Sequence, residues 1–324
     1  MDFWEAQRKA RGKTKLYITA FVMLTLAAAG LVEYLLRWIA PHAYHPSLPM
    51  LGLIFLGAVL LVAVTQYLIY RREGGAHVAK SMGGEEVSPD NTQPVLRQLH
   101  NIVQEVAISS GQPVPKVFIL PSNQINAFAA GTNAENAAVA ITVGALNKLN
   151  RDEVQAVIGH EFGHIYNRDM KISLQLAAMV MGFYFLLYYG MRLLQVSGMY
   201  GTPREYNYGR GFTITSLIAY LFLVGGIFSW FFGSLLKSLV SRQREYLADA
   251  CSVQFTRNPG AMADALRKIK RDHVSDMALT SMAYSHLFIN NTSFFSRLFP
   301  THPPIELRIK AIEGETYKPD RDLM

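Results

Sequence analysis

Long apolar runs alternate with polar stretches along the chain, and four of these runs are candidates for membrane-spanning helices. A helix needs about 20 apolar residues to cross the hydrocarbon core of a bilayer, because it rises about 1.5 Å per residue. Buried core helices are the alternative explanation, but the length of the runs favours four transmembrane helices. They cover residues 16–39, 48–70, 172–191 and 212–236.

The first run is interrupted by Glu33 and is preceded by several basic residues. A cleaved signal peptide would share this basic start, but no clear small-residue cleavage site follows, and the second run begins after a short linker. We therefore interpret the first run as a membrane anchor that forms a hairpin with the second.

Lysine and arginine residues near the ends of the runs indicate the orientation of the chain. They gather before the first run, after the second, before the third and after the fourth. Because such residues are enriched on the cytoplasmic side of a membrane, both termini are expected in the cytoplasm. The polar stretches 71–171 and 237–324 then lie on the same side, where they can form one domain that is split in sequence.

The first polar stretch shows the patterns of helices and short strands. Apolar residues recur at helical spacing from Pro94 to Ser109, and Gly111 is typical of a helix end. A later helix is expected to begin at Asn150, because Glu153 stands where it completes a capping box. Short strands are predicted between these two helices at residues 116–120, 126–130 and 137–143.

Composition excludes several classes of protein. Hydrophobic residues make up 50% of the chain and charged residues only 17%, which excludes a disordered chain and an ordinary soluble globule. The single cysteine, Cys251, excludes a disulfide scaffold and a multi-cysteine metal cluster. Much of the net charge of +7 lies beside the apolar runs, so we attribute it to membrane topology and expect no nucleic-acid partner.

The helix that begins near Asn150 contains His160 and His164, which are four residues apart and share one face. Both imidazoles can reach one tetrahedral zinc ion, and Glu161 beside them can take a proton from a zinc-bound water. Two exposed helix histidines with a solvated glutamate are the alternative. The remaining histidines have no partner at ligand spacing, and, His302 apart, we interpret them as loop or surface residues.

A catalytic zinc ion needs a third protein ligand and an open coordination position. Glu245 and Asp249 are also four residues apart, on the helix that continues from the fourth run. Glu245 can ligate zinc, and Asp249 can accept the free N–H of a ligating histidine. Taken alone, both would be interpreted as solvated acids, but the histidine pair leads us to expect them at the metal.

These motifs, together with His302-Pro303-Pro304 near the end, resemble the HtpX-type integral-membrane zinc endopeptidases. The resemblance covers nearly the whole chain, and relatives of that family include the CAAX prenyl proteases and the mitochondrial metalloprotease Oma. It implies one zinc ion per chain and a gluzincin-like (zincin) domain in the cytoplasm. It also implies cleavage of misfolded or damaged membrane proteins at the bacterial inner membrane.

Asn126, Ala127, Phe128 and Ala129 resemble the edge strand with which gluzincins hold peptide substrates. An edge strand has unpaired N–H and C=O groups that pair with any extended peptide. An ordinary core strand is the alternative. The expected partners are therefore the lipid bilayer and membrane-protein substrates in an extended conformation.

His302 has three possible roles. It can donate a proton to the developing oxyanion, or ligate zinc as a fourth group in a closed resting state, as the resemblance implies for some relatives. It can also cap the turn that contains Pro303. Arg308 either holds the following helix or pairs with an acid near the site.

The expected fold is mainly α with a small β-sheet, in which four transmembrane helices accompany a gluzincin-like metalloprotease domain split in sequence. Charged residues on both sides of the zinc helix argue against intramembrane proteolysis, and Glu161 argues against a non-catalytic chaperone or adaptor. A transporter is disfavoured because no run carries a charged pair at mid-depth. The expected parts are a basic segment and first transmembrane hairpin (1–70), a first catalytic part (71–171), a second transmembrane pair with a short external loop (172–236) and a second catalytic part (237–324).

Overall fold

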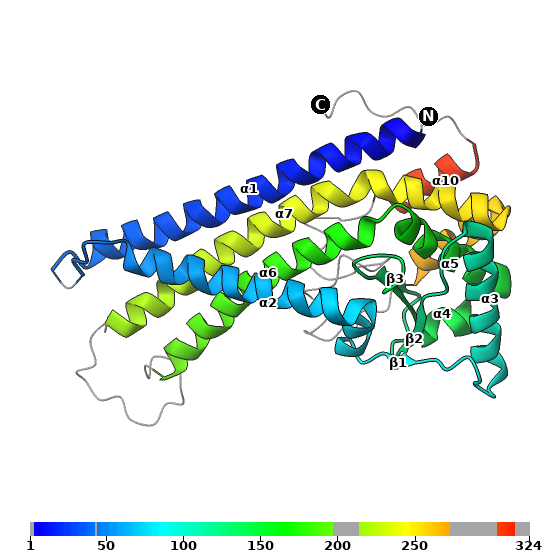
Figure 1. Ribbon diagram of the computed structural model, residues 1–324, viewed down its shortest axis with the longest axis horizontal. Coiled ribbons are helices and arrows are strands. Elements are labelled where there is room, and N and C mark those ends of the chain that lie inside the picture. Colours follow the sequence, from blue (N-terminus) through cyan, green and yellow to red (C-terminus); the bar gives the residue numbers. More distant parts are fainter. Residues whose placement is uncertain (1–2, 43, 197–213, 273–302, 315–324) are drawn as a thin grey trace. The chain divides into compact units, whose positions relative to one another are not determined.

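Helices dominate the computed structural model, which describes residues 3–42, 44–196, 214–272 and 303–314 (Figure 1). One small sheet accompanies them, so the expectation of a mainly α protein with a small β-sheet is confirmed. The helices are α1 (Phe3–Ile39), α2 (Met50–Ser81), α3 (Pro94–Ser110), α4 (Val143–Lys148), α5 (Arg151–Tyr166), α6 (Asp169–Val196), α7 (Ile214–Thr256), α8 (Pro259–Arg271) and α10 (Ile305–Ile312). The strands are β1 (Glu85–Glu86), β2 (Lys116–Leu120), β3 (Ala127–Ala130) and β4 (Ala138–Thr142).

Three of the four predicted spans are confirmed as helices that are long and apolar enough to cross a membrane. They are Thr19–Ile39 in α1, Met50–Ser81 in α2 and Asp169–Gln195 in α6. In α7, the residues whose side chains are described include a shorter apolar stretch, Ser216–Phe228. The fourth span, and with it the total of four, stays a prediction.

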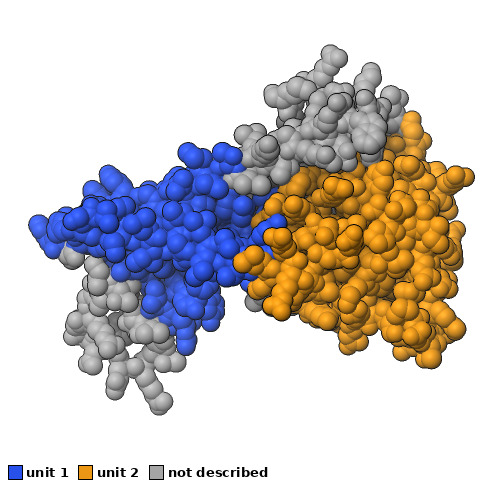
Figure 2. Space-filling view, in the orientation of Figure 1, with its two compact units in different colours: residues 1–67, 176–236 blue, residues 68–175, 237–324 orange. Residues whose placement is uncertain are grey.

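The contacts between residues divide the chain into two compact units, which have different colours in Figure 2. Unit 1 comprises residues 1–67 and 176–236, and unit 2 comprises residues 68–175 and 237–324. Each unit therefore combines two segments that are far apart in the sequence. The histidine and carboxylate motifs belong to unit 2.

Unit 1 has a core of aromatic and branched side chains from four helices. Phe21 of α1 stacks on Phe183 of α6 with ring centroids 5.0 Å apart. Phe55 of α2 meets Phe222 of α7 edge to face at 6.2 Å. Aromatic pairs of this kind add packing attraction, on which helices depend where lipid surrounds them.

Glu33 is buried in unit 1, although it lies within the candidate span of α1. Its carboxylate accepts hydrogen bonds from Arg37 Nε at 2.7 Å, from the Tyr44 hydroxyl at 3.0 Å and from the N–H of Gly52 at 3.1 Å. The Tyr44 hydroxyl also accepts from the N–H of Leu51 at 2.8 Å. These two N–H groups belong to the first turn of α2, which has no earlier helical carbonyl for them, so Glu33 and Tyr44 cap that helix.

The sheet of unit 2 has the strand order β1-β2-β4-β3. β1 pairs with β2 and β3 pairs with β4 in antiparallel fashion, whereas β2 and β4 are parallel. β3 therefore lies at an edge among the described strands. The core beneath the sheet is shared with α3, α5 and α8.

The end of α2 packs against the β3–β4 hairpin within unit 2. Gly74 has φ 65° and ψ −154°, which kinks the helix, and the N–H of Gly75 donates to Asn136 O at 2.9 Å. A Cβ atom on Gly75 would lie 2.0 Å from Ala130 O. Only glycine permits this approach, which supports the last residue of β3.

Candidate active site and metal centre

The histidine pattern lies on α5, whose first turn is fixed by a capping box. Asn150 Oδ1 accepts from the N–H of Glu153 at 2.9 Å, and Glu153 Oε2 accepts from the N–H of Asn150 at 2.7 Å. The predicted helix start is therefore confirmed. His160 and His164 follow on one face of this helix, with ring centroids 4.9 Å apart.

Small residues allow α5 and α7 to approach closely. A Cβ atom on Gly163 would lie 2.8 Å from Ala248 Cα, so a larger residue would push the two helices apart. Ser252 of α7 donates a hydrogen bond to the Ala156 carbonyl of α5 at 2.6 Å. This approach brings Glu245, about one turn before Ala248, to the histidines.

Glu245 faces both histidines. Its Oε2 lies 3.6 Å from His160 Nε2, and its Oε1 lies 3.6 Å from His164 Nε2. One ligand atom from each of the three residues lies within 4.8 Å of the other two. The two separations of 3.6 Å suit ligand atoms that share one metal ion at about 2.0–2.2 Å. The three residues thus form a cluster that can hold a metal ion.

A carboxylate lies next to the Nδ1 atom of each histidine, on the side of the ring away from Glu245. His160 Nδ1 lies 2.8 Å from Asp249 Oδ1, and His164 Nδ1 lies 3.4 Å from Asp169 Oδ2. A proton on each Nδ1 leaves the Nε2 lone pair directed at Glu245. His160 Nε2 has no hydrogen-bond partner although the residue is fully buried. Such a nitrogen is costly unless a ligand binds it, so both the donor set and this atom fit a bound cation.

Arg308 of α10 is fully buried beside the cluster. Its Nε and Nη2 donate to the two carboxylate oxygens of Asp249 at 2.8 and 2.6 Å, and its Nη1 lies 3.3 Å from Glu245 Oε2. A forked contact between guanidinium and carboxylate combines two charge-assisted hydrogen bonds. The structure confirms that Arg308 pairs with an acid near the site, and this pair fixes the carboxylate that holds His160.

The two buried carboxyl groups nearest the cluster have pKa values shifted in opposite directions. Burial raises the pKa of Glu161 to about 7, although the charge of His164 and a backbone hydrogen bond oppose the rise. Burial would also raise the pKa of Asp249, but Arg308 holds it below its usual value. Asp249 is therefore a fixed negative charge, whereas Glu161 can gain and lose a proton near neutral pH.

The pKa values of the two histidines are also shifted in opposite directions. Burial lowers the pKa of His160. Burial opposes a charge on His164 as well, but the hydrogen bond to Asp169 and the charges of Glu245 and Glu161 raise its pKa to about 9. A cation bound at Nε2 would displace the proton, because only neutral imidazole ligates a metal.

The segment expected to form an edge strand lies directly beside Glu161. The N–H of Thr142 in β4 donates to Asn126 O at 3.0 Å. In an antiparallel pair the backbone groups of successive residues point alternately to the partner strand and away from it. Residues 126, 128 and 130 therefore bond to β4, whereas Ala127 and Ala129 direct their N–H groups away from β4. The N–H of Ala127 bonds to Asn126 Oδ1 at 3.1 Å, and the N–H of Ala129 bonds to the Glu161 carboxylate. Asn126 precedes the strand, which begins at Ala127 and continues through Phe128 to Ala130.

The sequence motifs do not include Asp169, the partner of His164 in the structure. This residue begins α6 five positions after the histidine, and Arg244 Nε lies 3.4 Å from its other oxygen. An acid so close to the second histidine was the available signal. His302 lies outside the described residues, so its role stays a prediction.

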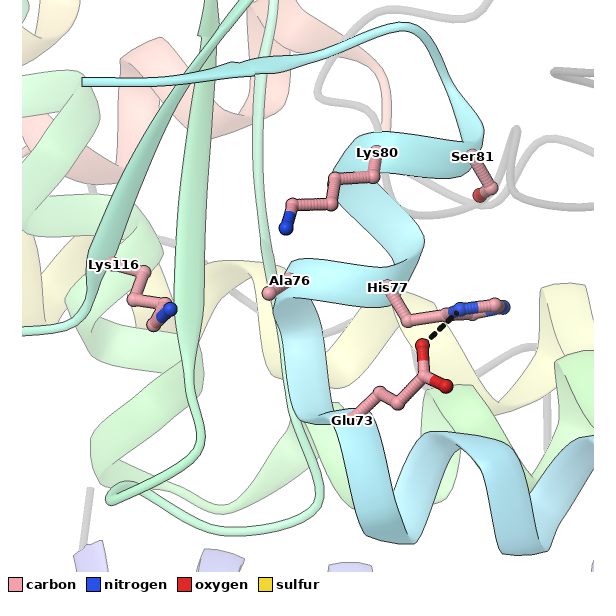
Figure 3. Close-up of a pocket in the computed structure, with 6 residues that line it drawn as sticks. All are labelled: Glu73, Ala76, His77, Lys80, Ser81 and Lys116. Atoms are coloured by element: carbon pink, nitrogen blue, oxygen red, sulfur yellow. Dashed lines mark hydrogen bonds and ion pairs between the residues drawn. The ribbon is translucent and has the colours of Figure 1, made fainter.

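A separate hollow of about 510 Å³ lies beside the end of α2 (Figure 3). His77 Nδ1 lies 2.7 Å from Glu73 Oε2, and Lys116 pairs with Glu86 at 3.1 Å, so opposite charges largely cancel there. His100 is buried in α3, which corrects its interpretation as a loop or surface residue. His77 lies on α2 with its side chain 28% exposed, as expected for a surface residue. The hollow is lined by Glu73, Ala76, His77, Lys80, Ser81 and Lys116, none of which belongs to the metal-binding cluster.

Comparison with known proteins identifies the family. The family model described as Peptidase family M48 matches residues 95–316, which contain the whole cluster. The chain belongs to peptidase family M48. Membership in M48 makes it a metalloprotease, a hydrolase of peptide bonds, and implies a metal ion, for which His160, His164 and Glu245 offer a place.

Two relatives of this M48 chain are both named Protease HtpX homolog. The one from Thermoanaerobacter pseudethanolicus is 34% identical over 314 residues, covering 97% of this chain and 98% of the relative. The one from Caldanaerobacter subterraneus subsp. tengcongensis is 32% identical with the same coverage. The resemblance to HtpX-type proteases is confirmed, and with several apolar helices the chain is a multi-pass, membrane-bound M48 metalloprotease.

One solved structure is also similar to this M48 chain. The crystal structure of S. mikatae Ste24p matches with 20% identity and a TM-score of 0.49, covering 92% of this chain and 67% of that chain.

Proposed function

We propose that the chain is a zinc endopeptidase that cleaves misfolded or damaged membrane proteins on the cytoplasmic side of the bacterial inner membrane. The observation that carries this proposal is the buried His160 Nε2, which has no hydrogen-bond partner and faces Glu245 at 3.6 Å. His164 Nε2 stands at the same distance from the second Glu245 oxygen. A set of two imidazoles and one carboxylate is typical of a catalytic zinc ion, one per chain.

Three protein ligands leave a fourth position open for water or substrate. Zinc, when bound, supplies a Lewis acid that polarises the peptide carbonyl and lowers the pKa of water. Asp249 and Asp169 orient the two imidazoles from outside the cluster, and Arg308 keeps Asp249 ionised and in place.

Glu161 is the proposed general base. It follows His160 on α5 and is almost fully buried. A pKa raised to about 7 suits a group that must take a proton from water and pass it to the leaving amine near neutral pH. The Ala129 N–H holds its carboxylate at the edge of β3, where a peptide would lie.

The proposed substrate is an extended chain that pairs with Asn126–Ala129. An edge strand binds through its backbone and so accepts many sequences, as clearance of damaged proteins requires. The apolar helices of the enzyme place it where membrane proteins are found. The cytoplasmic orientation rests on the distribution of lysine and arginine. His302 remains a candidate for an oxyanion donor or a resting-state zinc ligand.

The test compares wild type with Glu161→Gln on an unfolded membrane protein in detergent, with zinc content measured on both. We expect the variant to keep one zinc ion per chain and to lose about 10²–10⁴ in kcat, because glutamine cannot take a proton. Wild type and Glu161→Gln in sealed vesicles of each orientation test on which side of the membrane the active site lies. Cleavage is expected only where the substrate meets the cytoplasmic face.

Glu153→Gln is the matched control. Glu153 is also a buried glutamate of α5, but it belongs to the capping box rather than the cluster. Its replacement should lower stability and leave zinc content and kcat per folded molecule unchanged. Loss of zinc in Glu161→Gln, or full activity without the carboxylate, would refute the assigned role.

A further inference from the structure

The free edge of β3 meets a carboxylate from another helix. Asp272, directly after α8, accepts the backbone N–H of Ile125 through Oδ2 at 2.5 Å. Its Oδ1 lies 2.7 Å from Lys148 Nζ, and its side chain is only 8% exposed. A buried, ion-paired carboxylate thus occupies a backbone donor just before the strand begins.

The N–H of Ile125 points to the same side as those of Ala127 and Ala129. Thr142 Oγ1 accepts from the N–H of Asn126 at 3.0 Å and donates to Gln124 O at 2.6 Å. Residues 124 and 126 therefore face β4, and the intervening residue faces away from it. The Asp272 carboxylate stands where the next carbonyl of an added peptide strand would have to lie.

Residues 122–125, the lead-in to β3, are held in place beside Asp272 by further hydrogen bonds. Lys148 also donates to Asn123 O at 2.6 Å, and the N–H of Gly144 donates to Ser122 O at 2.8 Å. A Cβ atom on Gly144 would lie 2.2 Å from Asn123 O, so the backbones are in direct contact. The segment cannot move aside to offer a different donor.

Displacing Asp272 would be costly for a peptide. The buried carboxylate would lose a charge-assisted hydrogen bond, and its ion pair with the more exposed Lys148 would be disturbed. Proteins end exposed sheet edges with charged side chains for the same physical reason.

The outward N–H groups of Ala127 and Ala129 also have side-chain acceptors, which are the neutral amide oxygen of Asn126 and the Glu161 carboxylate. The acceptor of Ile125 differs because it is a buried carboxylate that Lys148 holds in place. Pairing with the strand should therefore stop at Ile125.

We propose that Asp272, held by Lys148, sets the length of the substrate-binding edge. An extended peptide pairs with the strand between Ala129, beside Glu161, and Ile125, a distance of four residues or about 13 Å. On the side of the cleaved bond that faces Ile125, only about four substrate residues pair with the strand. Substrate residues beyond these four add no binding free energy. This inference rests on the proposed zinc-dependent cleavage beside β3.

The experiment uses the full-length, zinc-loaded enzyme in detergent and a nested series of peptides around one cleavable bond. Each peptide is lengthened by one residue, first on one side of the bond and then on the other. For wild type we expect kcat/KM to rise as the peptide is lengthened. On one side of the bond it should become constant once about four residues are present. The same series is measured as binding of labelled peptides to zinc-loaded Glu161→Gln, so that the result does not depend on turnover.

Asp272→Ala should move this limit outwards by about two residues, because outward N–H groups recur at every second position. The longest peptides should then bind about fivefold better than they bind to wild type, as one added hydrogen bond allows. The shortest peptides should be unaffected. Asp272→Asn keeps an acceptor oxygen and should keep the wild-type limit.

Lys270→Ala is the structural control, since Lys270 of α8 pairs with Glu306 at 2.6 Å, an ion pair that involves neither Asp272 nor Lys148. It should lower the melting temperature without altering the length dependence, and Asp272→Ser serves as a second variant should Asp272→Ala not fold. An unchanged limit in a folded Asp272 variant, or weaker binding of peptides of every length, overturns the proposal. Failure of the proposed function looks different, because no peptide of any length would then be cleaved in a zinc-dependent way.

Discussion

Unit 1 and unit 2 each bury a carboxylate beside an arginine. In unit 1, Glu33 accepts hydrogen bonds from Arg37, Tyr44 and Gly52, all within one helical hairpin. In unit 2, Glu245 lies near Arg308 and two histidines, but a nitrogen of His160 in the same cluster has no hydrogen-bond partner.

The difference separates a carboxylate that supports the fold from one that serves a ligand. Protein donors alone satisfy the Glu33 network, which connects two helices and needs nothing else. The cluster of unit 2 has three side chains, and one of their atoms, His160 Nε2, has no hydrogen-bond partner in the protein. Its members are held by partners outside the cluster, such as Asp249 and Arg308, so the geometry exists before a metal arrives.

The largest effect that tests this comparison is expected from Asp249→Asn. Asparagine keeps the shape of the side chain but loses the charge that supports His160, so zinc affinity should fall about 10- to 100-fold. Competition with a chromophoric chelator measures the change. Glu33→Gln, an equivalent substitution in unit 1, should leave zinc affinity unaltered, and equal losses in both variants would remove the distinction between the two regions.

The pH dependence of metal binding tests the cluster further. In the metal-free protein the pKa of His164 is raised to about 9, so the residue carries a proton at pH 8 that a metal must displace. Zinc binding at pH 8 should therefore release about one proton per chain, and apparent affinity should fall up to tenfold for each pH unit below 9. Calorimetry in buffers of different ionisation enthalpy measures the proton count. A count of zero would show that His164 is neutral before the metal binds.

The smallest effect concerns Glu33 of unit 1. Glu33→Ala removes the acceptor of the Gly52 N–H and of the Tyr44 hydroxyl, which should lower the free energy of unfolding by about 1–3 kcal/mol. Thermal unfolding in detergent measures the loss, and Glu33→Gln should lose less because one acceptor oxygen remains. Zinc content and kcat per folded molecule should stay at the wild-type level. Reduced zinc content in folded Glu33→Ala would mean that this carboxylate serves the metal after all.

Local patterns predicted the elements that depend on local forces. The strand expected at residues 116–120 is confirmed as β2, and α3 ends at the predicted Gly111, which adopts φ 66°. The capping box of α5 was predicted from Asn150 and Glu153, because both partners lie within one turn. Short elements such as β1 and α4 were missed, since neither is long enough for a periodic pattern.

Contacts between distant segments were harder to predict. The spacing of four residues within each motif indicated that His160, Glu161, His164 and Glu245 act together. The position of Asp169, five residues after His164, was a signal for their pairing, but no spacing indicated that Asp272 reaches Ile125. The second pairing depends on how α8 packs in the folded chain, which a single sequence does not state.

The wide separation of the site residues along the chain has a consequence during synthesis. The helix with His160 leaves the ribosome first, Glu245 follows only after α6 and most of α7 have been made, and Arg308 is later still. A growing chain therefore lacks the third residue of the metal-binding cluster and the guanidinium that fixes Asp249. Until α6 and most of α7 have been translated, the nascent chain cannot assemble this cluster.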